Sequence, residues 1–279
     1  MLKKLLRYDF KALLKFWWIG LLSTFVLSLG AGISGTFLTS EKEFPYIINI
    51  VSVFIIVIAV ISLFAFSLLT NIMIYVRYYK NLFTDEGYLT FTLPLKRSQV
   101  LNSKFISGLV ISLSTFFTVA IETVAGLCIA FHRDIFTKQF YNEINDALTE
   151  ISKANYFDEI FTFIILGLLT VVLVYASSLL FTFLCITIGS VITRKNKVAT
   201  AIGIYYGATV ILSFMGQIFT LFGMTGLISW SEKIIEFDNL VFGYYLIGAF
   251  LVIIFFVATI ATILYTINYW LLDKKLNLS

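Results

Sequence analysis

The chain has 279 residues, of which 59% are hydrophobic, 17% aromatic and only 13% charged. This composition is typical of a polytopic membrane protein and excludes an ordinary soluble domain. The formal net charge is +4, and no basic patch is interleaved with aromatic residues, so no nucleic-acid partner is predicted. The sequence lacks a Gly-x4-Gly-Lys-Ser/Thr phosphate loop, and any ATP chemistry is therefore expected on another chain.

Six apolar runs are long enough to cross a hydrocarbon core of about 30 Å, which takes roughly 20 helical residues. We expect membrane helices near residues 17–38, 47–78, 105–131, 160–192, 198–222 and 243–272. The predicted fold class is all-α, and residues 1–279 are expected to form a single transmembrane domain in the lipid bilayer.

Basic residues predict the orientation of these spans, because Lys and Arg stay on the cytoplasmic side. Fifteen of the 20 Lys and Arg residues lie in residues 1–16, 77–104, 194–197 and the C-terminal tail. Eleven of the 16 carboxylates lie on the opposite side. We therefore predict a multi-pass protein of the cytoplasmic (plasma) membrane with both termini in the cytoplasm.

Residues 1–16 form a predicted amphipathic helix, with five leucines on one face and five cations on the other. Such a helix is expected to lie in the inner membrane interface. A cleaved signal peptide is a poor alternative, because charges continue to Lys15 and only five spans would remain.

The segment 77–104 separates the second and third spans and contains the sequence TDEGYLTFTLPLKRSQVLNSK from residue 84 onward. Thr84 or Asp85 is suited to cap a short helix, and Gly87 and Pro94 interrupt the chain. Tyr88, Leu89, Phe91 and Leu93 place bulky apolar side chains beside charges in a loop that should face water. The pattern indicates a docking surface, with packing against the loop's own helix ends as the alternative.

This loop, placed after the second of six hydrophobic spans, resembles the first cytoplasmic loop of ABC-2-type exporter permeases from Gram-positive bacteria. The resemblance implies a coupling helix that sits in a groove of a separate ATPase subunit. It implies two ABC ATPase subunits and a second permease copy or paralogue as partners. ATP and Mg would be bound by the ATPase, with no cofactor on this chain. The residues it assigns to coupling are Thr84, Asp85, Glu86, Gly87, Tyr88 and Leu89.

Two further features follow from the resemblance. Residues 1–16 would be an elbow helix that leads into the first span and helps to contact the ATPase, with a simple membrane anchor as the alternative. Residues 223–242 would form short re-entrant helices on the outer side, where Gly223 and Gly226 interrupt an apolar sequence.

Small residues recur at four-residue spacing in the first span and in the fifth, which lets two helices approach closely. They are Ser28, Gly32 and Thr36 in the first span and Ala199, Gly203 and Gly207 in the fifth. In the resembled family these spans line the interface between two permease subunits. The alternative is packing inside one subunit.

Glu122 is the one acidic residue inside a predicted span, where an ionised carboxylate is costly unless it is paired or faces water. It is a candidate pathway residue that would bind a cationic substrate group, or a structural tie between helices. The outer segment 132–158 is expected to contain a helix with an apolar stripe of Phe140, Ile144, Leu148 and Ile151. That helix would lie on the outer leaflet, cover an exit or simply be a solvated surface helix.

The leading functional hypothesis is an exporter permease for an amphipathic or hydrophobic substrate, with peptides favoured by the resemblance. The alternatives are a secondary transporter, which should show internal repeats and several intramembrane ionisable groups, and a non-transporting scaffold or sensor. An intramembrane enzyme is the weakest hypothesis, since one His and one buried Glu make neither a catalytic constellation nor a metal site.

Overall fold

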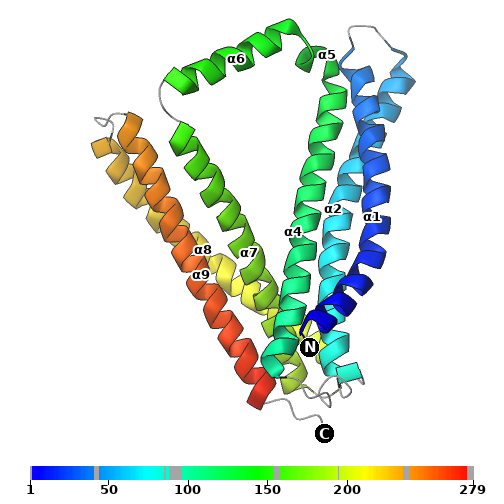
Figure 1. Ribbon diagram of the computed structural model, residues 1–279, viewed down its shortest axis with the longest axis vertical. Helices are drawn as coiled ribbons and strands as arrows, with labels where there is room; N and C mark the ends of the chain where they lie inside the picture. Colours follow the sequence, from blue (N-terminus) through cyan, green and yellow to red (C-terminus); the bar gives the residue numbers. More distant parts are fainter. Residues whose placement is uncertain are drawn as a thin grey trace. The chain divides into compact units, whose positions relative to one another are not determined.

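The computed structural model describes residues 2–40, 44–84, 86–87, 96–153, 157–193, 195–234 and 239–274. The long helices are α1 (Leu2–Leu38), α2 (Tyr46–Phe83), α4 (Arg97–Ala130), α7 (Phe157–Ile192), α8 (Lys197–Ile234) and α9 (Asn239–Lys274) (Figure 1). Each contains an apolar stretch long enough to cross a membrane. The predicted all-α fold with six candidate membrane spans is thus confirmed.

The chain divides into two compact units. Unit 1 consists of Met1–Tyr78 and Asn102–Phe157, and unit 2 of Tyr79–Leu101 and Asp158–Ser279. The boundary between the units falls inside α2, after Tyr78, and inside α4, before Asn102. Each gives most of its length to unit 1 and one end to unit 2.

In unit 1, helices α1, α2 and α4 lie side by side (Figure 1). Helix α4 runs parallel to α1, because contacts advance along both helices in the same direction. Trp17 Nε1 donates to Thr115 Oγ1, and further along Ser28 Oγ donates to the Glu122 carbonyl. Helix α2 runs antiparallel to α1, since Gly20 faces Phe66 and Gly30 faces Ile55.

The predicted amphipathic segment is helical and continues into the predicted first span as helix α1, whose first turns bend away from the rest (Figure 1). No Pro or Gly occurs in α1 before Gly20, so nothing in the sequence breaks the helix at this boundary. Its buried residues mostly recur at three- or four-residue spacing, on one side of the helix: Asp9, Leu13, Trp17, Thr24, Ser28, Gly32 and Gly35, with Ser34 beside them. The first turns of α1 therefore bury their inner face against protein.

Beyond α4, the chain forms the short helices α5 (His132–Ile135) and α6 (Lys138–Lys153), and α6 runs across the direction of the long helices of unit 1 (Figure 1). The helix expected in segment 132–158 is confirmed. Its apolar residues Ile144 and Leu148 are exposed. The side chain of Ile151 lies outside the described part of the chain.

In unit 2, α7 and α8 form a tight hairpin. A Cβ atom on Gly189 would lie 2.6 Å from the Ala201 amide nitrogen, and the hydroxyls of Thr193 and Thr200 are 2.8 Å apart. Helix α9 packs on α7 through Asn268, whose side-chain amide donates to the Leu180 carbonyl at 3.0 Å.

The region 223–242, predicted to hold short re-entrant helices, contains the end of α8 and the beginning of α9, and its re-entrant course stays a prediction. Helix α8 runs unbroken to Ile234 and α9 begins at Asn239, so the residues described here hold no separate helix between them.

Candidate functional site

The predicted coupling segment begins where α2 ends. The Thr84 hydroxyl donates to the Lys80 carbonyl at 2.5 Å, and the Gly87 amide donates to the Thr84 carbonyl at 2.7 Å. These bonds satisfy a carbonyl of the last turn of α2 and hold Gly87 close to it; Glu86 and Gly87 are again helical. Among the predicted coupling residues, Asp85, Tyr88 and Leu89 lie outside the described residues.

Gly87 lies where no other residue fits. A Cβ atom at this position would come within 2.5 Å of the Leu82 carbonyl oxygen and 2.7 Å of its carbon. Both atoms belong to the backbone of a helix turn whose Leu82 side chain is completely buried, so they are held in place. Gly87 therefore brings the chain back against α2, while its neighbour Glu86 is exposed.

A second contact holds the end of α2. Lys197, the first residue of α8, donates from Nζ to the Phe83 carbonyl at 3.3 Å. A cation at the carboxyl end of a helix also interacts favourably with the helix dipole. The link between α7 and α8 is thus joined to the base of the predicted coupling segment, a contact that sequence periodicity does not reveal.

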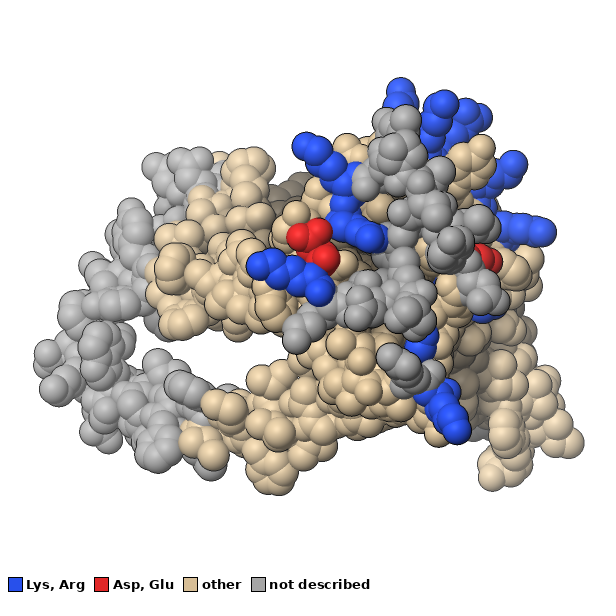
Figure 2. All heavy atoms as spheres, turned by 90° about the horizontal axis from the view of Figure 1, so that it is seen from below, with Lys and Arg blue, Asp and Glu red and all other residues tan. Residues whose placement is uncertain are grey.

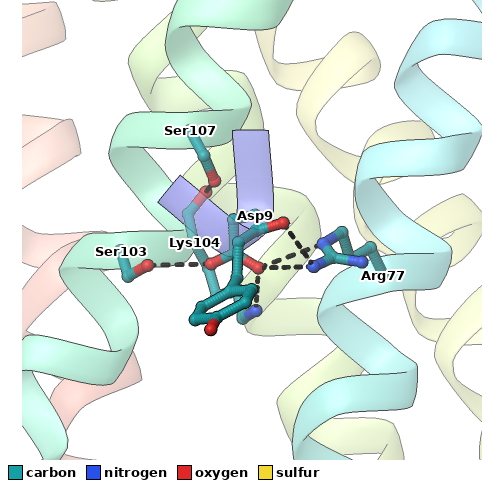
Figure 3. A network of polar contacts seen from close by, with 6 residues as sticks. Asp9, Arg77, Ser103, Lys104 and Ser107 are labelled. Atoms are coloured by element: carbon teal, nitrogen blue, oxygen red, sulfur yellow. Dashed lines mark hydrogen bonds and ion pairs between the residues drawn. The ribbon is translucent and has the colours of Figure 1, made fainter. Parts of the chain in front are cut away.

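In unit 1, Asp9 forms a buried ion cluster with residues from two other helices (Figure 3). Its Oδ1 accepts from Lys104 Nζ at 2.5 Å and from Arg77 Nε at 3.0 Å, and its Oδ2 accepts from Ser103 Oγ at 2.8 Å. Arg77 also donates to the Tyr8 carbonyl at 3.2 Å. One carboxylate therefore joins α1 to both α2 and α4.

The role of Asp9 was not predicted from the sequence. A signal was nevertheless present, because Asp9 is the one acidic residue among the first 40 and lies four residues from Leu5 and from Leu13, on the leucine face of the helix. A carboxylate on an apolar face needs a cationic partner when it is buried. This requirement could have been used to predict an ion pair at Asp9.

The opposite face of the first turns of α1 is cationic. Its side chains Lys3, Lys4, Arg7, Lys11 and Lys15 are all exposed. Lys and Arg side chains also predominate among the charged groups seen from below (Figure 2). The helix therefore buries one acid and exposes five bases.

The two stripes of small residues have different surroundings. Ser28 donates to the Glu122 carbonyl at 2.6 Å, and a Cβ atom on Gly32 would lie 2.9 Å from the Gly126 carbonyl oxygen. In α8, added Cβ atoms on Gly203 and Gly207 would meet nothing within 4 Å, and Ala199 is exposed.

Glu122 lies inside unit 1 and is only 2% exposed. Its Oε1 accepts from Thr24 Oγ1 at 3.2 Å, whereas its Oε2 is buried without a hydrogen-bond partner. Its location between α1 and α4 agrees with a tie between helices.

Comparison with protein-family models, with curated proteins and with solved structures finds no match for this chain. The resemblance of segment 84–104 to a permease loop therefore stays a prediction.

Proposed function

We propose that this chain is the permease subunit of an ABC-2-type exporter. In this proposal it works with a second permease copy or paralogue and with two ATPase subunits that bind ATP and Mg. The substrate leaves the cell across the cytoplasmic membrane and is amphipathic or hydrophobic, with peptides as the favoured class. Both termini and segment 84–96 would lie on the cytoplasmic side, where the exposed cations of α1 satisfy the positive-inside rule.

The observation that carries this proposal is the anchored base of segment 84–96. A loop that transmits force needs a rigid attachment, since displacement of a loose one would be absorbed locally. Here Gly87 is pressed against the backbone of Leu82, and Lys197 binds the final carbonyl of α2. The chain is therefore held in place at Phe83 and Gly87, directly before the proposed docking residues.

Helix α2 has the length needed to carry such a displacement into the membrane. Its 38 residues extend about 57 Å at 1.5 Å per residue, well beyond a hydrocarbon core of about 30 Å. ATP-driven movement of the docked loop would then shift the balance between inward-open and closed arrangements of the spans.

The first experiment tests the turn at Gly87. The chain is co-expressed with candidate ABC-type ATPase subunits, purified through a tag on the chain and reconstituted in lipid nanodiscs. Gly87→Ala is expected to lower ATPase activity in the complex by about tenfold, because the added methyl forces the turn away from Leu82. Gly167→Ala is the matched control, as a Cβ atom there meets nothing within 4 Å.

Glu86→Arg tests the exposed carboxylate of the same turn. We expect this variant to insert normally and to lose export of a reporter peptide, because charge reversal disrupts a contact with a basic ATPase surface. Glu150→Arg, on the exposed helix α6, is the control and should export normally. Normal export by Glu86→Arg, or the absence of any co-purifying ATPase, would refute the proposal.

A secondary transporter is the second candidate, and Glu122 is the observation that favours it. A carboxylate 2% exposed within a span, with Oε2 lacking a partner, has the character of an intramembrane ionisable group. Uptake or efflux driven by an ion gradient in vesicles without ATP would support this candidate, and its abolition by Glu122→Gln would identify the group.

A further inference from the structure

We propose that Asp9 is a positioning residue that clamps both ends of segment 77–104 to the first helix, so that movement of the loop is passed to α1. The clamp itself follows from unit 1 alone, whereas its part in coupling depends on the proposed exporter function. The residues of this cluster are not among the proposed coupling residues, which lie between Thr84 and Leu89.

The clamp joins the two sides of the loop. Arg77 lies in α2, before the loop, and Lys104 lies in α4, after it; both bind Oδ1 of Asp9 (Figure 3). The neighbouring Ser103 occupies the second carboxylate oxygen. One carboxylate, that of Asp9, therefore bridges the two ends of the loop.

Burial makes this bridge strong and intolerant of change. Asp9 is 2% exposed, Lys104 5% and Ser103 0%. Charges removed from water attract each other more strongly, and removing one partner leaves the others buried without compensation. Loss of Asp9 would leave Lys104 buried beside Arg77 with no carboxylate between them.

The remaining charges of the first turns reinforce this dependence. Lys3, Lys4, Arg7, Lys11 and Lys15 have the same sign as Arg77 and Lys104. Asp9 is the one carboxylate of this segment, and without it the cations of the first turns would repel Arg77 and Lys104. The leucine contacts on either side of Asp9 would have to hold the helix end alone.

The clamp is placed where a displacement would pass to the membrane spans. Arg77 and Lys104 lie within three residues of the points where α2 and α4 cross between the two units, at Tyr78 and Asn102. From Asp9, α1 continues without a break into the seam where Trp17 and Thr24 bond to α4. A rigid helix can carry a change at one end to these bonds.

The clamp is tested first without any ATPase, by hydrogen–deuterium exchange of the chain in nanodiscs. Asp9→Asn should accelerate amide exchange in residues 2–12 by about tenfold or more, because these turns then open locally. Asp146→Asn on exposed helix α6 should leave exchange unchanged. Unchanged exchange in Asp9→Asn would overturn the clamp.

A second variant keeps the test decisive if Asp9→Asn fails to fold. Arg77→Gln removes the partially exposed cation, whose side chain is 26% accessible, and leaves the buried Asp9–Lys104 pair intact. It should accelerate exchange in residues 2–12 by a smaller factor, about threefold. Exchange equal to wild type would again contradict the clamp.

The coupling role is tested with the ATPase present. Asp9→Asn should still form the complex while its transport per ATP hydrolysed falls about tenfold, and the charge swap Asp9→Lys with Lys104→Asp should restore part of it, because the carboxylate again lies between cations. Full coupling in Asp9→Asn despite rapid exchange would refute this role. If no complex forms with the wild-type chain, the exporter proposal fails, whereas the exchange result stands.

Discussion

The first helix and the fifth long helix, α1 and α8, carry the same small-residue spacing in two different environments. On α1, Ser28 and Gly32 are covered by α4 of the same chain, with a backbone carbonyl 2.9 Å from where a Gly32 Cβ would be. On α8, Gly203 and Gly207 have open space around the corresponding position. The comparison shows that a small-residue stripe predicts close approach but does not identify the partner helix.

The different surroundings of the two stripes bear on whether each packs inside one chain or between two subunits. The contacts of Ser28 and Gly32 are those of packing inside one chain, which was the alternative interpretation of the first stripe. The stripe of Ala199, Gly203 and Gly207 retains the space that a second permease copy would need, and its assignment to a subunit interface stays a prediction. Thr36 donates to its own helix, at the Ile33 carbonyl.

Gly32→Leu should have the largest effect on stability, because the new side chain cannot enter the space held by Gly126 and Ile129. Overpacking of this kind costs about 3 kcal/mol or forces the helices apart. Thermal unfolding of the purified chain in nanodiscs measures the loss. A variant as stable as wild type would mean that α1 and α4 do not pack at this position.

Gly203→Leu combined with Gly207→Leu is expected to leave the unfolding free energy of the single chain within about 0.5 kcal/mol, since both positions are open. The same change should lower the dimer fraction in lipid by about tenfold if a second copy packs on this face. Subunit counting by single-molecule photobleaching in liposomes measures the dimer fraction. An unchanged dimer would show that this face of α8 contacts lipid instead.

Glu122→Gln should have a small effect on stability and none on assembly. The amide retains the oxygen that accepts from Thr24 and supplies no buried charge, so the expected change in stability is below about 1 kcal/mol. If Glu122 is only a tie, export is also unchanged. Strong loss of export with normal unfolding would instead make it a pathway residue, and Glu122→Asp would then show whether the charge is what matters.

Some features of the candidate site could be predicted from residue patterns and others could not. Gly87 was identified from the sequence as a break in the loop, and the structure supplies the reason in the backbone of Leu82. The contacts made by Lys197 and Asp9 were not predicted, because each joins residues at least 68 positions apart in the chain. A local sequence pattern does not predict a contact between residues so far apart in the chain.

The sequence by itself determined the class of protein and its helices. Apolar runs of sufficient length must cross a membrane as helices, because the backbone can satisfy its hydrogen bonds in no other local way there. The tertiary structure decided which faces meet. It joined the first turns of α1 to its span as one helix, extended α8 to Ile234, and placed Asp9 between Arg77 and Lys104. Those outcomes depend on the shape and charge of distant neighbours, which only the folded chain brings together.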